Sequence, residues 1–232
     1  MKIFTTPKRN TVAAFAAATL LAVTAFGNTV QAEIIDWTPT SWAQELRAMP
    51  EGDPSVGEDL HVNMFCASCH GAKGESMTDN WPNLAGQRAE YTYKQLIDYQ
   101  DGRRHEDERA TLMITAVANL SRQDMADLSA FYAAQPVPGS NETDQDHPAH
   151  PLVSVGDPQR LITPCAACHG VAGSGGINES STLRGNPEAY FIRTMKAFRD
   201  GRRDNDVAKG MSQFAEHLTD EEIEALADYY AP

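Results

Sequence analysis

The second half of this 232-residue sequence repeats the first half at an offset of 99 residues. The matched positions are Cys66 and Cys165, Leu84 and Leu183, Gly86 and Gly185, Tyr91 and Tyr190, and the runs 102–104 and 201–203. After a one-residue deletion the offset becomes 98, and Met113 then matches Met211. Solenoid repeats are at most about 50 residues long, so a repeat of this length indicates a duplicated domain.

Each copy contains the pentapeptide Cys-x-x-Cys-His, and the two copies use all four cysteines of the chain. The residues are Cys66, Cys69 and His70 in the first copy, and Cys165, Cys168 and His169 in the second. This spacing is typical of a c-type haem attachment site, in which two thiols add to the haem vinyl groups and the adjacent histidine binds the iron. We therefore expect two covalently bound haem c groups, with the two histidines as iron ligands.

Three other uses of these cysteines are open to the sequence. Two disulfides in an exported protein would also require an even number of cysteines. Two Cys-x-x-Cys pairs could bind a zinc ion, and thioredoxin-like redox motifs share the same spacing. Disulfides and zinc leave the histidine after each second cysteine unexplained, and a redox motif requires a βαβ pattern that this sequence lacks.

The N-terminus has the pattern of a secretory signal peptide. Three basic residues precede an apolar run from 11 to 26, and small residues follow at 30–32. The apolar run is shorter than the roughly 20 residues that a membrane span needs, although an uncleaved anchor is an alternative. Without residues 1–32 the chain keeps 16 basic and 32 acidic residues, a net charge of −16. This charge argues against a nucleic-acid partner. It either favours docking to a basic patch on another protein or only keeps the protein soluble.

Helical periodicity occurs at matched places in both copies. Apolar residues spaced i, i+4, i+7 predict one helix over 89–101 and another through Phe191, Met195 and Phe198. A helix over 55–69 would lead into the first haem motif, whereas the Gly-, Asn- and Pro-rich segment after it reads as a loop. We therefore expect an all-α fold.

The last helix of each copy begins with a capping signal. Ser121 is followed three residues later by Asp124, and Thr219 by Glu222. An apolar stripe follows each signal: Met125, Leu128 and Tyr132 in the first copy, and Ile223, Leu226 and Tyr230 in the second. A core of this size is small, so we expect the haem to supply much of the buried apolar surface and the haem-free chain to be largely unfolded.

The segment from 135 to 158 contains five prolines and several acids, which is typical of an exposed linker. His147 and His150 lie in it, either as solvated residues or as a stray metal site. The predicted organisation is a signal peptide (1–32), an N-terminal extension (33–54), a first domain (55–135), a linker (136–154) and a second domain (155–232). The extension contains Trp37 and Trp42, and it either packs on the first domain or forms an arm that docks a partner.

The second axial ligand of each iron decides the chemistry of the haem. Met113 and Met211 lie 43 and 42 residues after the histidine of their own copy, in what we expect to be the loop before the last helix. A methionine ligand raises the reduction potential and suits electron transfer, whereas an open position would allow peroxide or oxygen chemistry. The other candidates lie too close to the haem motif, on apolar helix faces, or at unmatched positions. They are Met64, Met77, Met125, Met195, His105 and His217.

Further matched runs are 82–87 and 101–104 in the first half and 183–186 and 200–203 in the second. With the haem motifs and methionines, they make each half resemble a class I cytochrome c. The pair resembles the two-haem cytochrome c4 family and its relatives, including the cytochrome subunit of flavocytochrome c sulfide dehydrogenase, over about residues 55 to 232. The resemblance implies two tandem class I cytochrome c domains joined by a Pro-rich linker.

In that family a proline carbonyl accepts a hydrogen bond from the proximal histidine. Pro82 matches this proline, whereas Ser181 takes its place in the second half. The serine carbonyl can still accept the bond, and because this bond tunes the iron we expect a different potential for the second haem.

The resemblance implies a periplasmic carrier that takes single electrons from a quinol-oxidising complex or a dehydrogenase and passes them to a terminal oxidase. A haem subunit of a dehydrogenase complex, such as flavocytochrome c sulfide dehydrogenase, is the alternative. An enzyme is the third hypothesis. A two-haem peroxidase would need a displaceable ligand, and a thiosulfate-oxidising haem enzyme would typically use a spare cysteine. We therefore expect no catalytic residues, no enzymatic activity, and no membrane span after signal cleavage.

Two repeated basic pairs, Arg103-Arg104 and Arg202-Arg203, stand out in this acidic chain. They could bind haem propionates, or form ion pairs with acids such as Glu106 and Asp204.

Overall fold

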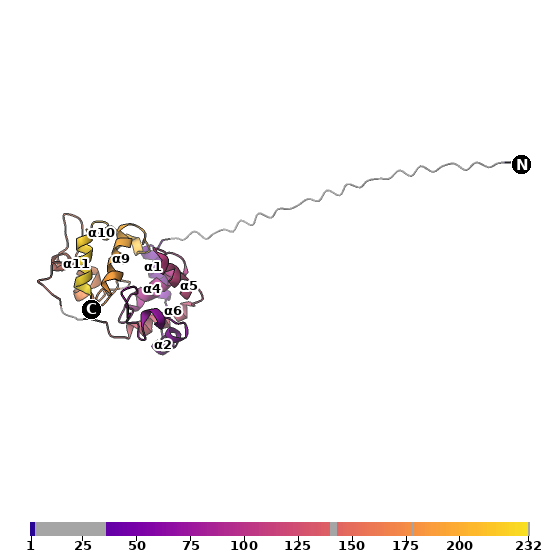
Figure 1. Ribbon diagram of the computed structural model, residues 1–232, viewed down its shortest axis with the longest axis horizontal. Helices are drawn as coiled ribbons and strands as arrows, with labels where there is room; N and C mark the ends of the chain where they lie inside the picture. Colours follow the sequence, from indigo (N-terminus) through magenta and orange to yellow (C-terminus); the bar gives the residue numbers. More distant parts are fainter. Residues whose placement is uncertain (3–35, 140–142, 178, 232) are drawn as a thin grey trace. The chain divides into compact units, whose positions relative to one another are not determined.

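The computed structural model describes residues 1–2, 36–139, 143–177 and 179–231 (Figure 1). Residues 34–232 form one compact unit. The predicted signal peptide therefore lies almost wholly outside the described residues. In the part that the structure describes, the chain is helical, with one isolated bridge between Asp157 and Ile162 and no strand, which confirms the all-α prediction. No helix among these residues is long and apolar enough to cross a membrane.

Six helices belong to the extension and the first half of the chain. They are α1 (Pro39–Ala48), α2 (Pro54–Asn63), α3 (Ala67–His70), α4 (Ala89–Gln100), α5 (Glu108–Val117) and α6 (Arg122–Ala133). The predicted helix over 89–101 is confirmed as α4. The prediction of a single helix over 55–69 is wrong, because the helix is interrupted between α2 and α3. Phe65 has φ 61°, a left-handed conformation through which an α-helix cannot continue.

The core of the first half forms where α2 crosses α6. Gly57 allows the close approach, since a Cβ there would lie 2.1 Å from the carbonyl oxygen of Asp127. The predicted capping box of Ser121 and Asp124 starts α6. It orients the predicted apolar stripe, and Met125, Leu128 and Tyr132 are all buried.

The second half contains α7 (His150–Ser154), α8 (Cys165–His169), η1 (Val171–Gly173), α9 (Glu188–Arg199), η2 (Val207–Lys209), α10 (Ser212–Ala215) and α11 (Asp220–Tyr230). Figure 1 shows α9, α10 and α11 grouped together, in orange to yellow. The predicted capping box of Thr219 and Glu222 begins α11. The stripe Ile223, Leu226 and Tyr230 is buried against the apolar face of α9, as the sequence predicts.

The expectation of an exposed linker is wrong for its C-terminal part. Residues 150–154 form α7, and Ala149 and Val153 are buried in the second core. The two linker histidines are neither solvated nor grouped as a metal site. His147 Nε2 lies 3.0 Å from a carboxylate oxygen of Asp228, and His150 Nδ1 lies 3.3 Å from the Tyr229 hydroxyl. Both histidines therefore fasten this segment to α11.

The N-terminal extension packs on the first half, as one of the two alternatives predicted. Trp42 of α1 is buried in the first core, and Trp37 packs against the same core. The extension also contacts the second half. The Trp42 indole N–H donates to Glu179, and the backbone N–H of Ala208 donates to the Trp37 carbonyl over 3.3 Å. Residues 37–42 thus join the two halves, a role that the sequence did not indicate.

Candidate functional site

Each haem motif folds as a short helical turn. Cys66 directly precedes α3, and Cys165 begins α8, so that the histidine ends the turn in both copies. None of the four cysteines, all of which lie in the described part of the chain, forms a disulfide. No cluster of three or more His, Cys, Asp or Glu side chains that could hold a metal ion occurs in the described parts of the chain. The disulfide and zinc alternatives therefore find no support in this geometry.

Both motif histidines are buried and held by one ring nitrogen. His70 Nδ1 lies 3.1 Å from the Pro82 carbonyl oxygen, and His169 Nδ1 lies 2.8 Å from the Ser181 carbonyl oxygen. Since a carbonyl only accepts, Nδ1 carries the proton and donates, which leaves a lone pair on Nε2. The Ser181 carbonyl thus replaces the missing proline carbonyl, as expected.

The protonation state of both histidines suits metal binding. Burial lowers the pKa of His70 to about 4 and lowers that of His169 as well. The imidazoles are therefore neutral near pH 7. His70 Nε2 is buried and has no hydrogen-bond partner. A buried nitrogen with a free lone pair in a cavity is what an iron ligand requires, so these residues fit a haem iron.

The two motifs open into one continuous cavity of about 680 Å³. Its walls bring together every site residue that the sequence singled out. These are Cys66, Cys69, His70, Met113, Cys165, Cys168, His169 and Met211. Apolar side chains of both cores complete the walls, including Leu84, Leu128, Leu183 and Leu226. A cavity of this composition fits the two apolar haem macrocycles.

The two predicted methionine ligands lie in different local structures. Met211 immediately precedes α10, close to where we expected it. The prediction of a loop at Met113 is wrong, because Met113 lies inside α5. Asp107 explains the difference, since its carboxylate accepts from the backbone N–H groups of Arg109 and Ala110 and so starts a regular helix before the methionine.

Asp206 is the repeat mate of Asp107, and its role was not among the sequence predictions. Its carboxylate accepts from the backbone N–H of Met211 over 2.7 Å and from that of Ser212 over 2.8 Å. The Ser212 hydroxyl donates to the same group. Asp206 therefore positions the backbone of the methionine itself. The matched Asp107–Asp206 pair is the sequence signal that could have revealed it.

The rival methionines are differently placed. Met125 is fully buried in the first core, and Met77 is almost fully exposed. Met64 and Met195 also line the cavity, but each packs against the core of its own half.

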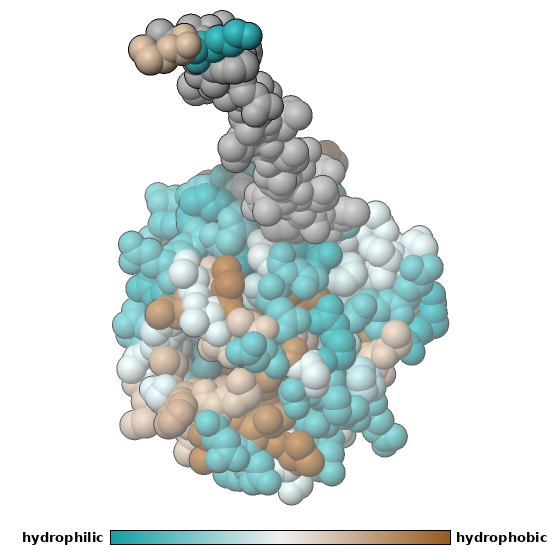
Figure 2. All heavy atoms as spheres, turned by 90° about the vertical axis from the view of Figure 1, so that its right-hand side faces the viewer, coloured by the Kyte–Doolittle hydropathy of each residue, from teal (hydrophilic) through white to brown (hydrophobic). Residues whose placement is uncertain are grey.

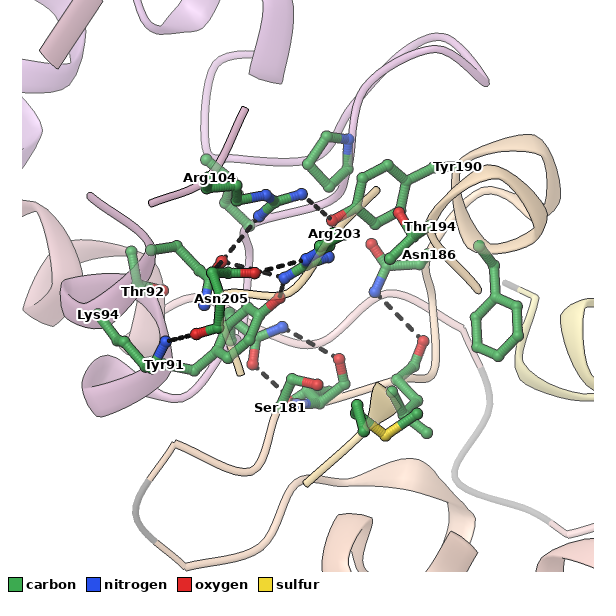
Figure 3. A pocket seen from close by; sticks show the side chains of 18 of the residues that line it. Tyr91, Thr92, Lys94, Arg104, Ser181, Asn186, Tyr190, Thr194, Arg203 and Asn205 are labelled. Atoms are coloured by element: carbon green, nitrogen blue, oxygen red, sulfur yellow. Dashed lines mark hydrogen bonds between the residues drawn. The ribbon is translucent and has the colours of Figure 1, made fainter. Parts of the chain in front are cut away.

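The four repeated arginines split into two pairs by burial. Arg103 pairs with Asp101 and stacks on Trp37, and Arg202 pairs with Asp200 rather than with Asp204. Arg104 and Arg203 are buried and line the cavity (Figure 3).

A buried polar network joins the two halves beside the cavity. Lys94 Nζ lies 2.5 Å from Asp98 Oδ2 and also donates to the carbonyl of Asn205. Asn205 Nδ2 donates to Asp98 over 2.6 Å and to Gln95 over 3.1 Å. Figure 3 shows Lys94 and Asn205 on this side of the cavity. The helical i,i+4 spacing of Lys94 and Asp98 was the only sequence signal for this network.

Known proteins share this arrangement. The family model described as "Cytochrome c" matches residues 55–133, and the one described as "Cytochrome C oxidase, cbb3-type, subunit III" matches residues 161–229. The fold, the paired motifs and these matches define the class: a two-domain electron-transfer cytochrome with two covalently bound haem c groups.

Individual relatives narrow the class to a family. Cytochrome c4 from Thiocapsa roseopersicina is 35% identical over 181 residues, which cover 77% of this chain and 91% of that protein. The crystal structure of reduced recombinant cytochrome c4 from Pseudomonas stutzeri is similar at TM-score 0.67 and 29% identity, over 77% of this chain and 97% of that one. A thiosulfate dehydrogenase electron acceptor from Stutzerimonas stutzeri (strain A1501) is 35% identical, over 72% of this chain and 78% of that protein. The chain belongs to the cytochrome c4 family, which confirms the resemblance predicted from the sequence.

Proposed function

We propose that this protein carries single electrons through two His/Met-ligated haems. The thiols of Cys66 and Cys69 would hold the first haem, and those of Cys165 and Cys168 the second. His70 and Met113 would ligate the first iron, and His169 and Met211 the second. The observation that carries the proposal is the pair of neutral, buried histidines, each held by a carbonyl, in a cavity that also contains one methionine from each repeat.

The chain's own residues would make electron transfer fast by holding the ligands still. The bound haem supplies an iron that cycles between the ferric and ferrous states. A hydrogen bond to a backbone carbonyl fixes each imidazole ring, and Asp206 fixes the backbone of Met211. With a histidine and a methionine bound to each iron, no open site would remain for peroxide or oxygen. No acid, base or nucleophile is needed, so we propose a carrier rather than an enzyme.

The proposed location is the periplasm, and the proposed partners are redox proteins. The signal-like residues 1–32 support export. The net charge of −16 beyond them supports donors and acceptors that dock through basic patches. Figure 2 shows one face on which apolar side chains gather among hydrophilic ones, a composition that suits transient docking. A terminal oxidase is the proposed acceptor.

The proposed electron donor is either a quinol-oxidising complex or a dehydrogenase. The relative named thiosulfate dehydrogenase electron acceptor supports a sulfur-oxidising donor in particular. The flavocytochrome c sulfide dehydrogenase alternative stays a prediction that rests on the sequence resemblance alone. Stopped-flow mixing of the ferric protein with thiosulfate dehydrogenase and thiosulfate would decide between a dehydrogenase and a quinol-oxidising donor.

The test of the carrier proposal is an absorption spectrum of the oxidised, haem-loaded protein. The weak red band of iron–methionine sulfur ligation, calibrated per haem, reports the number of His/Met sites. Full intensity for two haems supports the proposal. Half intensity or none contradicts it and would direct attention to peroxide or sulfur substrates.

A further inference from the structure

Arg203 is a buried guanidinium without a carboxylate partner in the part of the chain that the structure describes. Its Nε donates to Asn205 Oδ1 over 3.0 Å. Its Nη2 donates to Gln95 Oε1 over 3.0 Å and to the Tyr91 hydroxyl over 3.2 Å. All three acceptors are neutral. Its Nη1 is buried and has no hydrogen-bond partner.

The repeat mate of Arg203 has a different environment. Arg104 Nε lies 2.9 Å from Glu106 Oε1, and both side chains are less than a tenth exposed. Arg104 also donates to Gln95 over 2.9 Å and to the Tyr190 hydroxyl over 3.4 Å. Figure 3 shows Arg104 and Arg203 on the same side of the cavity, with Tyr190 beside them.

The repeat explains why the two arginines differ. Arg104 and Arg203 match at the offset of 99 residues, and the same offset aligns Glu106 with Asn205. The duplication therefore keeps both arginines, but it keeps the carboxylate only in the first copy. Arg203 has an amide where Arg104 has an anion.

The ion pairs of the buried network leave Arg203 out. Lys94 pairs with Asp98, and Arg104 pairs with Glu106. Arg203 is buried and has no carboxylate at ion-pair distance among the described residues, and a buried unpaired charge is strongly unfavourable. A carboxylate that enters the cavity would compensate it and would accept from the free Nη1.

The cavity restricts where that carboxylate can bind. A second anion beside Arg104 would meet Glu106, whose Oε2 is already buried without a donor. Arg203 offers a free N–H and no competing carboxylate. We infer that Arg203 binds the carboxylate of a haem propionate at the junction of the two domains, and that Glu106 excludes this role for Arg104. The inference rests on the proposed haem sites, but not on the identity of any partner.

Replacing Arg203 should change the potential of one haem. An ionised propionate near the iron favours the ferric state, and the guanidinium offsets part of that charge. In Arg203→Met the midpoint potential of one haem should fall, while that of the other should change less. Asn205→Glu supplies Arg203 with a competing carboxylate and should lower the same potential with the arginine retained.

The experiment is a spectroelectrochemical titration of both haems in the haem-loaded variants. Arg202→Met is the matched control, because it removes the same charge from the neighbouring exposed position, where Arg202 pairs with Asp200. Mass spectrometry confirms two attached haems in each protein. The wild-type spectrum tests ligation separately, so a failure of the His/Met proposal is recognised before the variants are compared.

The outcomes decide the inference either way. A selective fall in Arg203→Met and Asn205→Glu, larger than in Arg202→Met, supports propionate binding. Equal shifts in Arg203→Met and Arg202→Met would mean that only net charge matters and would overturn it. If Arg203→Met does not yield a folded two-haem protein, Asn205→Glu decides alone, and an unchanged potential there also overturns the inference.

Discussion

Replacing Asp206 by alanine should loosen the methionine ligand of the second haem without touching the iron. The carboxylate accepts from the backbone N–H groups of Met211 and Ser212 over 2.7 and 2.8 Å. It secures a segment under strain, because Ala208 and Lys209 have φ 52° and 57°. Such left-handed conformations cost of order 1–3 kcal/mol at residues other than glycine.

The size of the effect follows from the bonds that are lost. A hydrogen bond to a charged group contributes about 1.5–3 kcal/mol, and water replaces part of two such bonds because the site is only partly buried. We expect the methionine-bound state of the second haem to lose about 2–4 kcal/mol. This loss corresponds to a roughly 30- to 1,000-fold tighter apparent binding of an external ligand that displaces the methionine.

Imidazole titration of the ferric protein measures this displacement for each haem. In Asp206→Ala one haem should bind imidazole much more tightly, and half of the iron–methionine band should disappear at low imidazole. Asp107→Ala is the control, because its carboxylate accepts from Arg109 and Ala110 and not from the Met113 backbone. Imidazole affinities within about threefold of wild type at both haems would refute the reasoning, since the predicted change is at least tenfold larger.

Three other predictions follow from single contacts. The carbonyl of Ser181 lies nearer its histidine than the matched proline carbonyl does, which makes the imidazole more basic and the second haem lower in potential. Ser181→Pro should narrow the gap between the two midpoints in a redox titration, and equal midpoints in the wild type would contradict this account. Burial would raise the pKa of Glu106, but the charge of Arg104 prevails and lowers it to about 2. The ionised Glu106 carboxylate therefore contributes up to about 3 kcal/mol to the free energy of unfolding. This contribution is present above about pH 4.5 and is lost as the pH falls toward 2. Glu106→Gln should remove this part of the acid sensitivity in denaturant melts, and an unchanged slope counts against it. The Trp42 indole donates to Glu179 across the two halves, so a double-mutant cycle of Trp42→Phe and Glu179→Gln should give a coupling of about 1.5–3 kcal/mol, whereas additive effects would deny the link.

Patterns within a few residues of one another were predicted from the sequence. Both capping boxes, at Ser121 and Thr219, form as expected because their partners lie three residues away. The same holds for the apolar stripes of the last helices. The haem motifs and the repeat established two cytochrome domains, because covalent attachment requires residues at fixed local spacing. Local spacing did not reveal the break at Phe65 or the helix around Met113.

Contacts between distant residues were decided only by the tertiary structure. Arg203 and Tyr91 lie 112 residues apart in sequence, and Trp42 and Glu179 lie 137 apart. The sequence left both propionate binding and ion pairing open for all four repeated arginines. Burial separated them, because a surface arginine pairs with whichever acid is near, whereas a buried one must find a partner within its own cavity. The duplicated sequence thus determined two similar haem domains, and the way they pack made their arginines unequal.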